Sequence, residues 1–240
     1  KAIAGSTDYT GALAAAGRRA PCATTDLYES LAIADIQDAA DLLRGVYERA
    51  GRRDGYVSLE VSPLLAHDTA GTIAEARRLW AELGRENVMI KVPGTPEGTA
   101  AIRTIPGEGL NINVTLLFSR QAYDAVAEAY LAGLETYAAG GGDLSRVASV
   151  ASFFVSRIDS AVDEQIEAKL TSVTNAAARE GLRRLKGQIA IANAKLAYQR
   201  YGQIMATPRW KALADKGAQP QRLLWASTGT KNPAYRDTLY

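Results

Sequence analysis

The sequence predicts an α/β fold with parallel strands, of the (β/α)8 barrel type. The first observation behind this prediction is that five short apolar runs, each bounded by Gly, Asp, Asn or Pro, alternate with helical patterns. Such alternation indicates right-handed βαβ units around a parallel sheet. The second observation is that polar residues recur at matching positions in three consecutive runs. The expected strands are residues 56–62, 87–93, 111–118, 146–156 and 222–228.

Helical periodicity fills the intervals between these runs. Before the first strand, residues 13–53 have a helical pattern that is clearest over 27–50. Further helices are expected over 69–83, 120–137, around 157–179 and around 183–201. The chain shows no internal repeat and no linker-like stretch, so we expect residues 1–240 to form a single domain.

Polar residues inside the strands favour a barrel over an open doubly wound sheet. Glu60, Lys91 and Asn113 share one parity in three neighbouring strands, as Ser58 and Thr115 do, so these side chains should point to one face. Strands of a doubly wound sheet are covered by helices on both faces and read as continuous apolar runs. A barrel instead has a lumen whose carboxyl-terminal mouth holds the chemistry. We therefore expect these residues to line a lumen.

Composition and charge exclude several classes of function. The net charge of +2 is spread without a basic block, which argues against a nucleic-acid or membrane-surface partner. The sequence has one cysteine, Cys22, and one histidine, His67. Disulfides, zinc clusters and Cys–His or Ser–His–Asp nucleophile systems are therefore not expected. The sequence has neither a spanning apolar run nor a signal-peptide pattern, and a cytoplasmic protein is expected.

Lys91 is the candidate nucleophile, because it interrupts the apolar run VMIKVP. A lysine amine in a desolvated pocket is free to attack a substrate ketone and form a Schiff base. Two structural readings compete: the ammonium reaches water at the edge of the strand, or it forms an ion pair with Glu60 inside the lumen. The expected convergence of Glu60, Asn113 and Thr115 on the same pocket favours chemistry.

Four motifs carry a resemblance to a known family. They are SLEVSP at 58–63, MIKVPGT at 89–95, NINVTLLFS at 111–119 and SVASFFVSRID at 149–159. In this order and spacing they resemble the transaldolase family, in particular its bacterial members, over the whole chain. The resemblance implies a class I aldolase-type barrel in which Lys91 forms a Schiff base with a ketose phosphate, without a metal or an organic cofactor.

The implied reaction belongs to the pentose phosphate pathway. A dihydroxyacetone unit passes from sedoheptulose 7-phosphate or fructose 6-phosphate to glyceraldehyde 3-phosphate or erythrose 4-phosphate. In the resemblance, Glu60 and Thr115 hold the water that moves protons during Schiff-base formation. Asn113 and Ser152 match side chains that hold the hydroxyls of the three-carbon unit, although Ser152 also fits a small residue that fills a narrow lumen.

The resemblance also implies a phosphate site. Arg157 matches the family's phosphate-binding arginine, with an ion pair to Asp159 as the structural alternative. Ser227 resembles a phosphate-site serine, and Lys231 stands near a basic position of the family. Phe154 and Glu60 stand where fructose 6-phosphate aldolases have tyrosine and glutamine, which favours a transaldolase over that aldolase.

The resemblance leaves three family features unmatched: the first-strand aspartate that acts as general acid and base, the Asn-Pro of the second strand, and a final strand and helix. We therefore expect the five runs to be strands three to seven of a barrel within a longer natural chain. That chain would be a monomer or homodimer, and some family members are fused to a phosphoglucose isomerase. The alternatives are an enzyme like fructose 6-phosphate aldolase, a non-catalytic sugar-phosphate-binding domain, and a phosphate-binding isomerase barrel.

Overall fold

A computed structural model of the chain describes residues 5–16 and 23–229. Its centre is a parallel sheet of five strands in the order β1-β2-β3-β4-β5. The strands are β1 (Val57–Glu60), β2 (Val88–Pro93), β3 (Ile112–Leu117), β4 (Ser149–Phe154) and β5 (Arg222–Ala226). The α/β class and all five expected strands are therefore confirmed. Within the described residues β1 and β5 are open edges, so the closed barrel stays a prediction.

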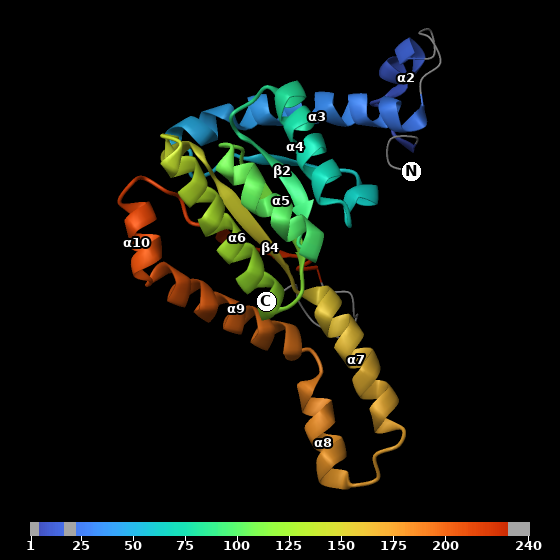
Figure 1. The fold of residues 1–240 in the computed structure, drawn as a ribbon. Helices are drawn as coiled ribbons and strands as arrows, with labels where there is room; N and C mark the ends of the chain where they lie inside the picture. Colours follow the sequence, from blue (N-terminus) through green and yellow to red (C-terminus); the bar gives the residue numbers. More distant parts are fainter. Residues whose placement is uncertain (1–4, 17–22, 230–240) are drawn as a thin grey trace.

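The helices connect successive strands and flank the sheet. The described helices are α2 (Thr10–Ala16), α3 (Thr24–Arg49), α4 (Thr69–Leu83), α5 (Pro96–Gly107), α6 (Arg120–Ala139), α7 (Ser156–Leu170), α8 (Ala176–Leu185), α9 (Ile189–Met205) and α10 (Pro208–Ala214). Figure 1 shows α4, α5 and α6 over one face of the sheet and α9 and α10 beside α6. The α7–α8 pair extends away from the sheet (Figure 1). In the described part of the chain, no helix has the length and apolar character of a membrane span.

Side-chain caps explain where several helices begin and end. Asp68 accepts a hydrogen bond from Gly71 N at 2.9 Å to open α4, and Gly84 closes it with a φ of 56°. Ser119 accepts from Ala122 N at 3.2 Å and opens α6. The cap of α6 lies two residues beyond the end of β3, so that helix starts directly after its strand, whereas a short 3-10 turn, Pro63–Leu65, separates β1 from α4.

Two expectations about helices differ from the structure. The helix expected around 157–179 is two helices, because α7 stops at Leu170 and Asn175 caps α8 by accepting from Ala178 N at 2.9 Å. The helix expected around 183–201 starts later, at Ile189. Helix α5 was not expected at all, since its sequence PEGTAAIRTIPG contains Gly and Pro, which weaken a helical pattern.

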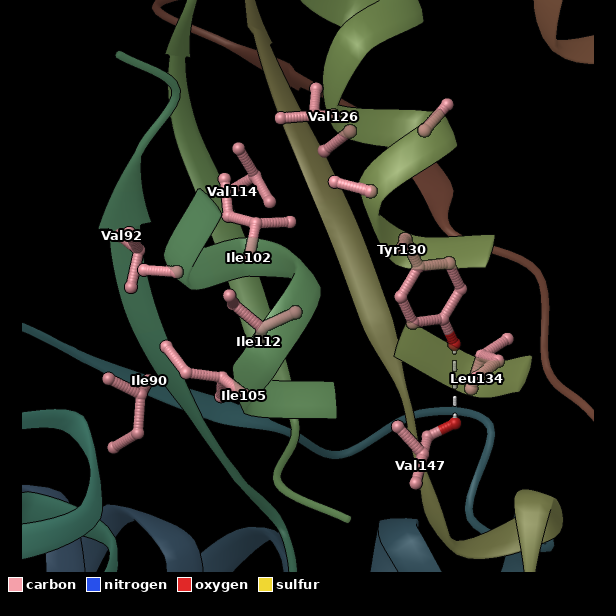
Figure 2. Packing of buried hydrophobic residues seen from close by; sticks show 14 of the residues in the cluster. Ile90, Val92, Ile102, Ile105, Ile112, Val114, Val126, Tyr130, Leu134 and Val147 are labelled. Carbon is pink, nitrogen blue, oxygen red and sulfur yellow. Dashed lines mark hydrogen bonds between the residues drawn. The ribbon is translucent and has the colours of Figure 1, made fainter. Parts of the chain in front are cut away.

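The hydrophobic core lies between the sheet and the helices that cover it. Figure 2 shows the apolar side chains of β2 and β3 against those of α5 and α6. These side chains, each at most 1% exposed, are Ile90, Val92, Ile112, Val114, Ile102, Ile105, Val126, Tyr130 and Leu134. The Tyr130 hydroxyl donates to the carbonyl of Gln219 at 2.9 Å and lies 3.5 Å from that of Val147.

The opposite face of the sheet carries the polar residues. Strand alternation places Glu60, Lys91, Asn113 and Ser152 there, while Ile90 and Val114 point into the core. At the amino-terminal end of this face, Met89, Ala148 and Val150 form a small apolar cluster of their own. The sheet therefore has a helix-covered apolar face and a polar face.

Candidate active site

Lys91 and Glu60 lie side by side on the polar face of the sheet. The register pairs Glu60 with Lys91 across β1 and β2, and Lys91 with Asn113 across β2 and β3. Lys91 Nζ is 3.2 Å from Glu60 Oε2, and the two side chains are 30% and 46% exposed. Lys91 thus stands on an inner strand, so its ammonium does not leave at a sheet edge. The ion pair with Glu60 is present, but pairs this exposed stabilise a fold by only about 0–1 kcal/mol.

Asn113 is held by hydrogen bonds from both sides. Its Nδ2 donates to Ser58 Oγ at 3.0 Å, and Ser152 Oγ donates to its Oδ1 at 2.8 Å. Asn113 and Ser152 are 8% and 3% exposed. This row across β1, β3 and β4 holds the Asn113 amide between two hydroxyl groups, so Ser152 is more than a small residue that fills space. Ser58 has a role here that parity alone did not assign.

Thr115 lies on the polar face, two residues beyond Asn113 in β3. Its register partner is Pro93, its carbonyl accepts from Gly94 N at 2.8 Å, and its side chain is buried. No direct hydrogen bond joins Thr115 to Glu60. The two side chains therefore share a face without a hydrogen bond between them.

Arg157 and Ser227 meet near the start of α7. Ser156 N donates to the Ser227 carbonyl at 2.8 Å, and the hydroxyls of these two serines lie 2.9 Å apart. Arg157 follows Ser156 in the first turn of α7 and places its guanidinium 5.0 Å from the ring centroid of Phe154. The first turn of a helix with an arginine attracts anions, because its backbone N–H groups and the helix dipole are both positive. Lys231 lies outside the described residues.

The alternative reading of Arg157, an ion pair with Asp159, is wrong. Asp159 is 1% exposed and its Oδ1 accepts from Ala190 N at 2.9 Å, which ties α7 to the first turn of α9. No ion pair joins Arg157 to Asp159. The guanidinium is exposed and held against an aromatic ring.

Hydrogen bonds join the loops that follow β1 and β2 at the same end of the sheet. Thr95 Oγ1 donates to the Ala66 carbonyl at 2.6 Å, and Thr69 Oγ1 donates to the Glu97 carbonyl at 2.8 Å. His67 Nδ1 lies 3.3 Å from Glu97 Oε2, and the pKa of Glu97 is lowered by its own backbone N–H and by His67. Sequence reasoning missed these hydrogen bonds, because bonds from threonine hydroxyls to carbonyl groups follow no regular spacing in the sequence.

The arrangement can support attack of an amine on a carbonyl group. A primary amine stands next to a carboxylate, an oriented amide and hydroxyl stand one and two strands away, and a cation lies at a helix start. In the described part of the chain, no three His, Cys, Asp or Glu side chains gather as metal ligands would.

Comparisons with known proteins cover the entire chain. A sequence profile described as Transaldolase/Fructose-6-phosphate aldolase matches residues 1–240. A transaldolase from Trichodesmium erythraeum is 53% identical over 240 residues, which are 100% of this chain and 63% of the relative. Transaldolase 2 from a Nostoc species is 54% identical over 241 aligned residues, with 100% and 63% covered. A transaldolase from Saccharopolyspora erythraea is 48% identical over 240 residues, with 100% and 62% covered. The chain thus spans 62–63% of the length of these three relatives.

Proposed function

This chain belongs to the Transaldolase/Fructose-6-phosphate aldolase family, and we propose that it carries the Schiff-base site of a transaldolase. The observation that carries the proposal is the contact of 3.2 Å between Lys91 Nζ and Glu60 Oε2 on an inner strand. The relatives named transaldolase, at 48–54% identity, support the same activity. The substrates are a ketose phosphate donor and an aldose phosphate acceptor, and the reaction transfers a dihydroxyacetone unit.

The first steps use Lys91 and Glu60. Once its ammonium has given a proton to Glu60, the amine of Lys91 attacks the donor ketone carbon, and the carbinolamine that forms loses water to give an imine. Glu60 is close enough to take a proton from the lysine nitrogen and return one to the departing hydroxyl. Because Thr115 and Glu60 share a face without a direct hydrogen bond, one water between them would pass these protons.

The carbon–carbon bond then breaks between C3 and C4 of the donor. A general base takes the proton of the C4 hydroxyl as C4 becomes the aldehyde carbon of the departing aldose phosphate, and the electron pair of the broken bond moves into the imine to leave a three-carbon enamine on Lys91. The resemblance gives this base role to a first-strand aspartate that no residue of this sequence matches. The Asn113 amide and the Ser152 hydroxyl, joined at 2.8 Å, can hold the hydroxyls of this unit. Attack of the enamine on a second aldose phosphate and hydrolysis of the new imine complete the transfer.

Arg157 and Ser227 are proposed to bind the substrate phosphate. The guanidinium suits an anion with several acceptor oxygens, and the first turn of α7 adds backbone donors. Lys231 is proposed as a further cation of this site. The polar sheet face that holds these groups is proposed to line a closed barrel in a single domain, which the sequential strand order supports.

Sugar phosphates are cytoplasmic metabolites, so the proposal places the enzyme in the cytoplasm. The proposal is consistent with a monomer or a homodimer. It is also consistent with a phosphoglucose isomerase domain that is fused to this domain in the natural chain. An aldolase like those that cleave fructose 6-phosphate is the second candidate, because the matched family includes both activities. Glu60 and Phe154 favour transfer over simple cleavage.

A coupled assay tests the proposed function. The full natural chain is incubated with fructose 6-phosphate and erythrose 4-phosphate, and glyceraldehyde 3-phosphate is followed with a dehydrogenase. A transaldolase releases it over many turnovers only when the acceptor is present, and no more than one equivalent per enzyme without it, whereas an aldolase turns over without the acceptor. A folded protein without either activity contradicts the proposal, and Lys91→Met is the inactive control.

A further inference from the structure

Strand β3 contains a bulge just before its end. Its register with β4 pairs Val114 with Ala151 and Leu117 with Phe153, so three steps along β3 correspond to two along β4. The extra residue falls at Leu116, which has a φ of 60° and is 41% exposed. A left-handed leucine is strained, and such bulges re-aim the side chains that follow them.

The bulge reverses the faces of the next two residues. In a regular strand Leu117 would share the polar face with Asn113, and Phe118 would point toward the helices. Instead Leu117 is fully buried in the core, in a space left by Gly94, where a Cβ would come within 2.6 Å of Leu117 Cδ2. Phe118 consequently lies on the side of the sheet that carries Phe154.

Phe118 forms one end of a row of three side chains. Its ring centroid is 5.0 Å from that of Phe154 at an interplanar angle of 37°. On Phe154 in turn rests the Arg157 guanidinium, 5.0 Å from the ring centroid. The backbone of Phe118 is anchored as well, since Asn193 Nδ2 from α9 donates to its carbonyl at 3.0 Å.

Within the described residues, no ion pair holds Arg157, so its contact with Phe154 is the interaction that orients the guanidinium. Phe154 is 8% exposed, while Phe118 is 40% exposed. Phe118 therefore covers Phe154 from the side of β3 and limits where that ring can move. An arginine held in place loses less side-chain entropy when it binds an anion than a freely rotating one does.

We infer that Phe118 is a positioning residue for Arg157, brought under the phosphate site by the bulge at Leu116. This inference rests on the proposed function only in that Arg157 binds the phosphate of the substrate. Phe118 touches neither Lys91 nor Glu60 in any interaction of the structure. It should therefore act on affinity for the phosphate group and leave the carbon chemistry at Lys91 unchanged.

The test measures phosphate affinity and turnover separately in the full natural chain. Phe118→Ala should raise the dissociation constant of inorganic phosphate and the KM for fructose 6-phosphate by about threefold to tenfold. This is the range expected when the cation–π contact between Arg157 and Phe154 is weakened. The kcat should stay within about twofold, because the chemical step is untouched. Phe118→Tyr keeps the ring and should restore both constants, and Tyr28→Ala, an exposed aromatic residue on α3, is the control.

A second variant guards against general unfolding. Phe118→Leu keeps an apolar side chain without a ring, and it should show the same direction of change at an unaltered melting temperature. Unchanged phosphate affinity in both variants overturns the inference, and so does a fall in kcat at constant KM. Phosphate binding that depends on Arg157 in a protein without transferase activity would contradict the proposed function. It would not decide this inference, because the phosphate dissociation constants of the Phe118 variants still measure the role of Phe118.

Discussion

Lys91 Nζ and Glu60 Oε2 lie 3.2 Å apart on residues that face each other across β1 and β2. The sheet register sets this distance, because paired residues of adjacent strands are neighbours on the same face. Both side chains are partly exposed, so a substrate can reach them from the polar face. An amine and a carboxylate held in this way can exchange a proton during imine formation.

Glu60→Gln should reduce kcat by about a hundredfold or more, the usual contribution of a general acid–base group. Its melting temperature should hardly change, since ion pairs this exposed contribute about 0–1 kcal/mol. Steady-state kinetics and thermal denaturation measure the two effects. Glu108→Gln, which removes an exposed ion pair with Arg77, is the matched control and should keep full activity. A Glu60→Gln protein with normal kcat would remove Glu60 from the mechanism.

Ser152→Ala should lower kcat/KM by about tenfold and the free energy of unfolding by about 1 kcal/mol, the typical contribution of one hydrogen bond. The buried Asn113 Oδ1 loses the donor that lies 2.8 Å away. Kinetics and urea denaturation measure these quantities. Ser172→Ala loses an exposed hydrogen bond to the Lys169 carbonyl and should change neither of them. Wild-type kinetics for Ser152→Ala would show that the Asn113 amide needs no such support.

Much of the sheet could be predicted because its strands have a strong periodic signal. The run 87–93 places Ile90 and Val92 on one parity and Lys91 on the other, and the structure buries the first two while leaving Lys91 partly open. The helices around 157–201 were harder to place, because only Asn175 and its cap mark the break after Leu170. Helix α5 buries residues 98, 101, 102, 105 and 106 at helical spacing and packs against α6, but four of its twelve residues are Gly or Pro near the ends, which obscures the period in the sequence.

Tyr130→Phe should reduce the free energy of unfolding by about 1–3 kcal/mol, because it leaves the partly buried Gln219 carbonyl without its donor. The hydroxyl donates to Gln219 O at 2.9 Å, and the side chain is 1% exposed. Figure 2 shows the same hydroxyl facing the Val147 carbonyl. Chemical denaturation gives the difference. Tyr9→Phe removes an exposed hydrogen bond to Asp35 and should cost far less. Equal losses in the two variants would mean that burial does not decide the value of this bond.

Glu135→Gln should make the protein less sensitive to acid. Arg209 donates to Glu135 at 2.7 and 2.8 Å and holds the pKa of that carboxyl below its usual value. As the pH falls through about 4.3, the usual pKa of an unfolded glutamate, the unfolded state takes up the proton first and stability drops. The variant has no such carboxyl group and does not lose this stability. For an ion pair as exposed as that of Arg209 and Glu135, the stability lost is under about 1 kcal/mol.

Thermal denaturation between pH 6 and 3 measures that difference. The melting temperature of Glu135→Gln should fall less over this interval than that of the wild type. Glu164→Gln removes another exposed glutamate, on α7, and should follow the wild type. A steeper acid loss in Glu135→Gln would contradict the assigned pKa direction.

The candidate site could be predicted only as far as strand parity and motif resemblance reach. Parity placed Glu60, Lys91 and Asn113 on one face, and the structure brings them together in register. Parity alone would give the wrong face for Phe118, because the bulge at Leu116 changes the count by one residue. The serine contact that joins Ser227 to the start of α7 is a long-range packing result, which no local pattern encodes.

Borohydride trapping tests the central claim most directly. The full natural chain is reduced in the presence of fructose 6-phosphate and digested with trypsin, which normally cuts after Lys91. The account predicts a three-carbon adduct on Lys91, read as an uncut peptide of residues 86–103, and its absence in Lys91→Met. An adduct on another lysine, or a folded and phosphate-binding protein without any adduct, would contradict Schiff-base catalysis at this site.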